Sequence, residues 1–137
     1  MSDLGADVII GTHPHVIQPV EFLTGSDGNQ TLVMYSLGNF LSAQDENTRM
    51  LGGMMRYTVV YHQDRQEVTF KDVSFLPTVT HIEGNFSLFR TYALKDYTDD
   101  LANKHTLHTH YSQDMSRSFL IHYVKQVMGD DIDIVYE

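Results

Sequence analysis

The sequence contains no cysteine and little positive charge. Without thiols the chain can form no disulfide framework, no zinc–thiolate site and no cysteine nucleophile. Nine lysines and arginines against eighteen aspartates and glutamates give a net charge of −9. Nucleic acids and anionic membrane surfaces select for basic proteins, so we expect no nucleic acid among the partners of this chain.

Long hydrophobic runs are missing as well. The apolar stretches are far shorter than the roughly 20 residues that a membrane-spanning helix needs, and the sequence does not contain the pattern of a signal peptide. We therefore expect a soluble chain without a signal or transmembrane segment. Its 137 residues are enough for one domain with a hydrophobic core.

The first half of the chain has the pattern of two β-hairpins. Apolar residues at 20–23 and 31–36 flank the turn-forming residues 25–29, which include glycine, aspartate and asparagine. Apolar residues alternate along 55–61 and resume after a polar turn at 63–66, which predicts the second hairpin.

Two signals mark the last strand of the second hairpin. The alternation slips by one residue at Lys71 and Asp72, which predicts a β-bulge, and we expect Pro77 to end the strand. Residues 81–90 are partly apolar but are interrupted by a Gly-Asn pair, so their pattern favours no single element.

The last third of the chain has helical spacing. Apolar residues between positions 93 and 101 predict a short helix, and a stripe between 115 and 127 predicts a longer one. We expect Ser112 to cap the start of the longer helix and Gly129 to end it. The acidic tail from Asp130 is expected to be frayed or to contain a short strand.

Strands first and helices last indicate an α/β fold, a largely antiparallel β-sheet with two C-terminal helices. We expect a single domain over residues 1–137, with a strand-rich part at 3–92 and a helical tail at 93–137. Residues 2–6 resemble the last turn of a helix that ends at Gly5, directly before a buried strand. Because domains seldom begin in this way, we expect a C-terminal portion of a longer protein.

The most informative motif is the pair His13 and His15, which follows the β-branched run 8–10 and Gly11. Residues two apart on an extended segment share a face, so both imidazoles can point to one side. Neutral imidazole is the commonest ligand of zinc, iron and manganese-type ions. The bare pattern also fits two hydrogen-bonded loop histidines, and both interpretations stay open at this point.

Longer stretches surround this pair. They read Gly-Ala-Asp-Val-Ile-Ile-Gly at 5–11, Gly-Thr-His-Pro-His-Val-Ile-Gln-Pro-Val-Glu at 11–21 and Tyr-Ser-Leu-Gly-Asn-Phe-Leu at 35–41. In this order and separation they resemble the CapA family of capsule and poly-γ-glutamate synthesis proteins, which is similar in fold to the calcineurin-like metallophosphoesterases. The resemblance covers about residues 4–80, and the helical tail matches only loosely.

This resemblance implies a metal role for the histidine pair. In the wider phosphoesterase family a Gly-His-x-His motif supplies ligands to a dinuclear metal centre. The resemblance therefore implies that His13 and His15 are metal ligands and that Gly11 is the glycine of the motif. Thr12 is an inserted residue relative to that spacing.

Three further residues are candidates for supporting roles. Gln18 and Glu21 could each hold an imidazole N–H, and a solvent-facing position is equally open to them. Asn39 could hydrogen-bond substrate or brace the histidine loop. It could also be simply the asparagine of a tight turn after Gly38, because Gly-Asn favours such turns.

The family's earlier motifs, Asp-x-His, Gly-Asp and Asn-His, are absent around the histidine pair. A dinuclear site needs about six to eight protein ligands. We therefore expect divalent ions of the Mn, Fe or Zn type in a longer parent protein, and no stoichiometric metal, catalytic residue or activity in this fragment alone.

Two functions remain open for the parent protein. It could be a metal-dependent hydrolase of the phosphoesterase type, or a noncatalytic binding or scaffold component of a polymer synthesis or export complex. The expected partners are the missing N-terminal half, other capsule-synthesis components and a second copy of the chain through an exposed sheet edge. We expect the parent at the cell surface or anchored outside the membrane.

A second histidine cluster comprises His105, His108 and His110. Its spacing would suit a transition metal, but no carboxylate motif accompanies it, and adventitious binding explains such a cluster equally well. We expect this segment to lie between the two helices.

Overall fold

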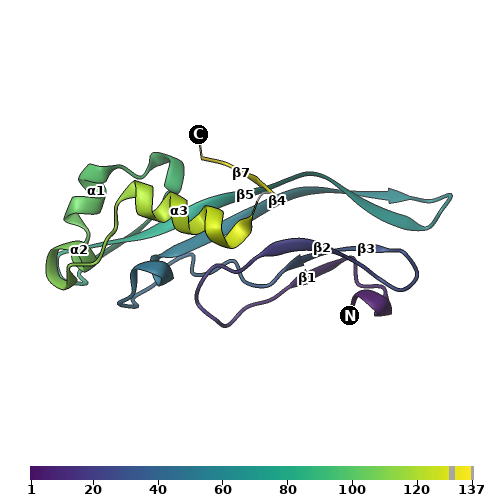
Figure 1. Cartoon of the computed structure of the whole chain (residues 1–137), viewed down its shortest axis with the longest axis horizontal. Helices are drawn as coiled ribbons and strands as arrows, with labels where there is room; N and C mark the ends of the chain where they lie inside the picture. The colour runs from purple at the N-terminus through teal and green to yellow at the C-terminus, as the bar shows by residue number, and fades with distance from the viewer. Residues whose placement is uncertain (130–131, 137) are drawn as a thin grey trace.

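The computed structural model describes residues 1–129 and 132–136, and its strands form two sheets (Figure 1). The first sheet contains β1 (Val8–Ile10), β2 (Val20–Thr24) and β3 (Gln30–Met34). The central strand β3 pairs with β1 in parallel and with β2 in antiparallel orientation. The first predicted hairpin is therefore confirmed, with β1 added along its other edge.

The second sheet contains β4 (Leu51–His62), β5 (Glu67–Glu83), β6 (Leu88–Ala93) and β7 (Asp133–Ile134). The long strand β5 pairs with β4 and β6 in antiparallel orientation and with β7 in parallel. The second predicted hairpin and the short strand in the acidic tail are confirmed. Residues 130 and 131, where we expected the tail to begin, lie outside the described residues.

The bulge in β5 is confirmed, but the predicted end of this strand is wrong. The register shifts between Arg56 and Thr58, and Asp72 has a φ of 53°. The strand then continues past Pro77 to Glu83. The proline is tolerated because, among the described residues, β7 pairs with β5 only up to Phe75 and β6 only from Thr78, so neither ladder includes Pro77 on that side.

The C-terminal part contains three α-helices among the described residues, and the prediction of two was wrong. They are α1 (Asp99–Lys104), α2 (Thr106–Tyr111) and α3 (Arg117–Met128), preceded by the 3₁₀ turn η3 (Leu94–Asp96). The extra helix begins immediately after α1 because the His105 side chain caps it by accepting the Leu107 N–H. Propensity and spacing do not reveal a histidine in this role.

The predicted cap of the long helix was also placed one turn too early. Ser116 caps α3 by accepting the Phe119 N–H, whereas Ser112 ends α2 in the left-handed conformation with a φ of 55°. The two serines are four residues apart, close to one helical turn, so the apolar stripe is in phase with both. Gly129 ends α3 as predicted, with a φ of 66°.

One hydrophobic core joins both sheets to the helices. Buried side chains from β2, β3, β5 and all three helices belong to the same cluster, among them Leu32, Phe75, Leu107 and Leu120. The two sheets also meet along the backbone, where Gly38 and Gly52 form an antiparallel bridge. Among the described residues, no helix has the length and apolar character that crossing a membrane requires.

Candidate functional site

The histidine loop leaves the first sheet at Gly11. Its N–H donates to the carbonyl of Met34, 2.7 Å away, at the end of the neighbouring strand β3. A side chain at position 11 would collide with the carbonyl oxygen of Tyr35. Glycine is therefore required here by this close approach, which brings the chain segments after β1 and β3 together.

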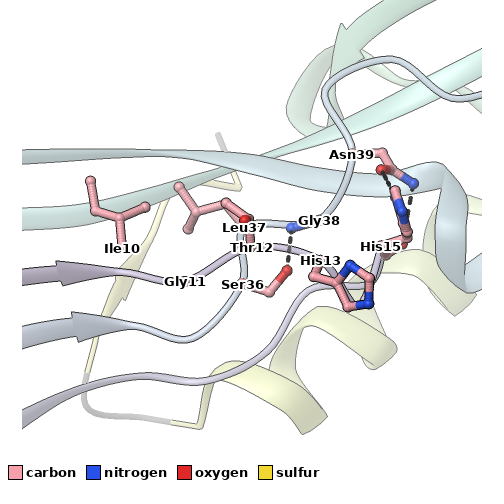
Figure 2. Close-up of a pocket in the computed structure, with 9 residues that line it drawn as sticks. All are labelled: Ile10, Gly11, Thr12, His13, His15, Ser36, Leu37, Gly38 and Asn39. Atoms are coloured by element: carbon pink, nitrogen blue, oxygen red, sulfur yellow. Dashed lines mark hydrogen bonds between the residues drawn. The ribbon is translucent and has the colours of Figure 1, made fainter.

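These two segments enclose a pocket of about 280 Å³. Because β1 and β3 are parallel neighbours, the loops that follow them emerge at the same edge of the sheet, a common position for ligand sites. The lining residues all come from these loops and strand ends (Figure 2): Ile10, Gly11, Thr12, His13, His15, Ser36, Leu37, Gly38 and Asn39. The two sequence stretches around the pair and around Asn39 thus meet in one site.

Both histidines are exposed, and their ring centroids are 6.3 Å apart. The sequence predicted an extended segment in which residues two apart share a face. The loop is not extended, so this prediction was wrong. His13 has a φ of 108° and His15 a φ of 60°. Positive φ is uncommon for residues other than glycine and costs free energy; it occurs in turns and also clusters at functional sites.

Asn39 is the predicted supporting residue that the structure brings to the pair. Its Oδ1 lies 2.9 Å from Nδ1 of His15, and its Nδ2 donates to the His15 carbonyl at 3.2 Å. Gly38 before it has a φ of 69°, so the predicted tight turn is also present. Asn39 therefore follows the glycine of a tight turn and also hydrogen-bonds the histidine loop.

Gln18 and Glu21 are not brought to the imidazoles. The carboxylate of Glu21 accepts from the hydroxyl of Tyr35 at 2.7 Å. This hydrogen bond raises the pKa of Tyr35 above its ordinary value. The backbone N–H of Gln18 donates to the Ser36 carbonyl at 2.9 Å. In the described part of the chain, no hydrogen bond joins either side chain to the histidine pair.

The described residues do not form a complete metal site by themselves. Among residues 1–129 and 132–136 there is no group of three or more histidines, aspartates or glutamates arranged to hold a metal ion. Zinc sites take three or four protein ligands. His13 and His15 can therefore contribute two imidazoles to a metal centre, and any further protein ligand has to come from elsewhere.

The segment with the second histidine cluster was expected to be a connection between two helices, and instead it contains a helix of its own. It forms α2, where His105 is buried while His108 and His110 are exposed. Nε2 of His105 donates to the carbonyl of Thr80 at 3.1 Å, and Nδ1 accepts from the Leu107 N–H at 3.0 Å. Burial lowers the pKa of His105 to about 4. Both nitrogens of this ring are used inside the fold.

A buried polar group around His81 was not identified from the sequence. Its ring is fully buried on β5, 5.3 Å from that of His105. Nδ1 pairs with the Tyr97 hydroxyl at 3.2 Å and Nε2 with the Glu83 carboxylate at 2.9 Å. This hydrogen bond lowers the pKa of Glu83, and burial raises that of Tyr97. No motif marks the group, because Tyr97 and His105 come from elements other than β5, which carries His81 and Glu83.

The part of the chain that forms the pocket is similar in sequence to known proteins. Residues 1–44 match the family described as bacterial capsule synthesis protein PGA_cap. The match stops short of residue 80, to which the sequence resemblance was expected to extend. It covers the first sheet, the histidine loop and Asn39, but not the second sheet or the helices.

Two curated proteins match the same length of sequence. The PGA biosynthesis protein CapA of Bacillus subtilis is 52% identical over 44 residues, and the capsule biosynthesis protein CapA of Bacillus anthracis is 46% identical over 44 residues. These residues are 32% of this chain, and the chain spans only 10% of the length of each relative. No solved structure matches. Residues 1–44 are thus similar to the bacterial capsule synthesis family PGA_cap, and two CapA proteins match a stretch of the same length.

Proposed function

We propose that His13 and His15 are two ligands of a divalent metal centre in a capsule-synthesis protein of the metallophosphoesterase type. The observation that carries this proposal is the pair of exposed imidazoles in one pocket, inside the 44 residues shared with the CapA proteins. The other ligands would come from an N-terminal half that completes the site. The chain by itself would hold no stoichiometric metal and hydrolyse nothing.

The chemistry of the donors fits this proposal. Neutral imidazole binds ions of the Mn, Fe and Zn type, and both rings are exposed enough to offer a nitrogen. In a completed centre the metal ions would activate water and neutralise phosphoryl oxygens. The role of this chain would be to present both rings in one pocket, with His15 held by Asn39.

One observation favours a second function, a noncatalytic component of a polymer synthesis or export complex at the cell surface. The described residues place no third metal ligand beside the pair. The short strand β1 lies at the edge of its sheet, so its free side could pair with the other half of the protein, another capsule-synthesis component or a second copy. In that case the pocket would be a binding platform.

Titration of the chain with Zn²⁺ tests the metal role of the pair directly. In NMR spectra of protein labelled with ¹⁵N-histidine, we expect the signals of His13 and His15 to shift first and together. The double substitution His13→Ala/His15→Ala should abolish this shift, whereas substitution of the exposed His122 on α3 should leave it intact. A first shift at His108 and His110 instead would contradict the proposal.

A chimera tests the biosynthetic role and separates the two functions. Residues 1–44 would replace the matching segment of the Bacillus subtilis relative, and cells would be assayed for polymer and the purified protein for metal. We expect His13→Ala and His15→Ala in this chimera to lower the amount of polymer and the metal content of the protein. Exposed Thr24→Ala is the control. Loss of metal with unchanged polymer would favour the noncatalytic component, and unchanged metal would overturn the ligand assignment.

A further inference from the structure

The side chain of Asn39 contacts one histidine at two points and is itself held from several sides. We infer that Asn39 is the positioning residue of His15 in the histidine pair: it places the proton of His15 on Nδ1, leaves Nε2 free, and makes this arrangement depend on the second sheet. This inference extends the proposed metal function to the support of the site. The tautomer of His15 can be measured without any metal. A negative result would therefore contradict this inference and leave the proposed metal function to its own test.

The orientation of the Asn39 amide follows from its surroundings. Its Nδ2 faces four acceptors within 3.1 to 3.3 Å: the carbonyls of His15 and Arg49, the side-chain Oε1 of Gln44 and the Oγ of Ser42. Carbonyl and amide oxygens only accept hydrogen bonds, so this side of the amide has to be the nitrogen. The opposite orientation would place an oxygen against three others.

The tautomer of His15 follows from that orientation. The amide oxygen of Asn39 faces Nδ1 of His15 at 2.9 Å, and because this oxygen can only accept, Nδ1 carries the hydrogen. A neutral imidazole has one donor and one acceptor nitrogen, so Nε2 keeps its lone pair. A ring fixed through Nδ1–H in this way presents Nε2 to a cation or a proton donor.

The same asparagine also supports the strained backbone of His15. Nδ2 of Asn39 donates to the backbone carbonyl of His15, which has a φ of 60°. A hydrogen bond to the ring alone would orient the ring relative to a mobile loop. With backbone and ring both bound to Asn39, the position of Nε2 is set by the position of Asn39 (Figure 2).

The position of Asn39 is set in turn by residues outside the 44-residue match. Gly52 of β4 lies so close to the Asn39 carbonyl oxygen that no side chain fits there, and Gly38 bridges to Gly52. The carbonyl of Arg49, in the turn before β4, accepts from Asn39 Nδ2 at 3.2 Å. The second sheet, which the family match does not cover, thereby supports the histidine pair.

The tautomer is read from long-range ¹H–¹⁵N NMR spectra of the whole chain with ¹⁵N-labelled histidine, at a pH well above the ordinary histidine pKa of about 6.5. We expect the Nδ1–H form for His15. Asn39→Ala should shift His15 to the mixture of both tautomers that an exposed ring adopts, and exposed Asn103→Ala should change nothing. A His15 with its hydrogen on Nε2 in the unaltered chain, or an unchanged spectrum in Asn39→Ala, overturns the assignment.

Gly52→Ala tests whether the second sheet controls the pair. Its added methyl group would push against the Asn39 backbone, so we expect the His15 tautomer to change although the substitution lies outside the pocket lining. If circular dichroism shows that this variant does not fold, Met50→Val takes its place, because Met50 is buried in the turn before β4 and follows the Arg49 carbonyl that accepts from Asn39; we expect a smaller change in the same direction. A folded variant with the original tautomer overturns the dependence on the second sheet.

Discussion

Two pairs of histidines lie at similar separations in this molecule and differ in every other respect. The rings of His13 and His15 are 6.3 Å apart, exposed and carried by a strained loop. The rings of His81 and His105 are 5.3 Å apart and fully buried, and each of their nitrogens has a partner. Buried polar atoms have to be satisfied inside the fold, whereas exposed ones remain available to a ligand. Burial therefore separates a structural pair from a candidate site.

The largest expected effect comes from removing a ring of the buried pair. His105→Ala deletes the cap of α2 and the donor to Thr80 and leaves a cavity, so we expect it to lower the free energy of unfolding by about 4 kcal/mol. Urea unfolding measures this loss. His122→Ala, an exposed control on α3, should stay within about 0.5 kcal/mol of the unaltered chain. Equal losses in the two variants would contradict the structural role of His105.

A pH series distinguishes the buried ring by its charge. Burial lowers the pKa of His105 from 6.5 to about 4, so the fold favours the neutral ring and the unfolded chain takes up the proton first. The stabilisation is complete above pH 6.5 and is lost as the pH falls toward 4, by roughly 3 kcal/mol. Urea unfolding at each pH measures it. His105→Gln should flatten this dependence, and an unchanged slope would show that other groups cause it.

The exposed pair should respond to substitution in the opposite direction. His13→Gly relieves a φ of 108° that glycine adopts without strain, so we expect the free energy of unfolding to rise by about 1 kcal/mol. His13→Ala keeps the strained backbone and should produce no such gain. Thermal or urea unfolding of the three proteins provides the measurement. A destabilised glycine variant would mean that the His13 side chain serves the fold, as that of His105 does.

The smallest effect is expected next to the exposed pair. Tyr35→Phe removes the hydrogen bond to Glu21 at the surface and should change stability by less than about 0.5 kcal/mol. The Zn²⁺-dependent shifts of His13 and His15 should also remain, because Glu21 is held by Tyr35 rather than by an imidazole. Loss of these shifts would mean that the Tyr35 hydroxyl supports the histidine pair.

Local patterns were sufficient where neighbours in sequence decide the structure. Both hairpins, the bulge at Asp72 and the helix end at Gly129 follow from alternation and turn chemistry within a few residues. The same patterns were insufficient where a distant partner decides. Pro77 remains within a strand because of where β6 and β7 begin to pair, and His105 begins a helix because its ring is enclosed by the fold.

The amino-acid sequence by itself determined the α/β class and marked the histidine pair and Asn39 as candidate residues, since these follow strand patterns and turn-forming glycines. Only the tertiary structure decided that His13 and His15 are strained and exposed while His81 and His105 are buried. It also decided that Asn39 holds His15 from a position supported by Gly52. Burial and close backbone approach depend on segments far apart in the chain, and no local pattern records which segments will pack together.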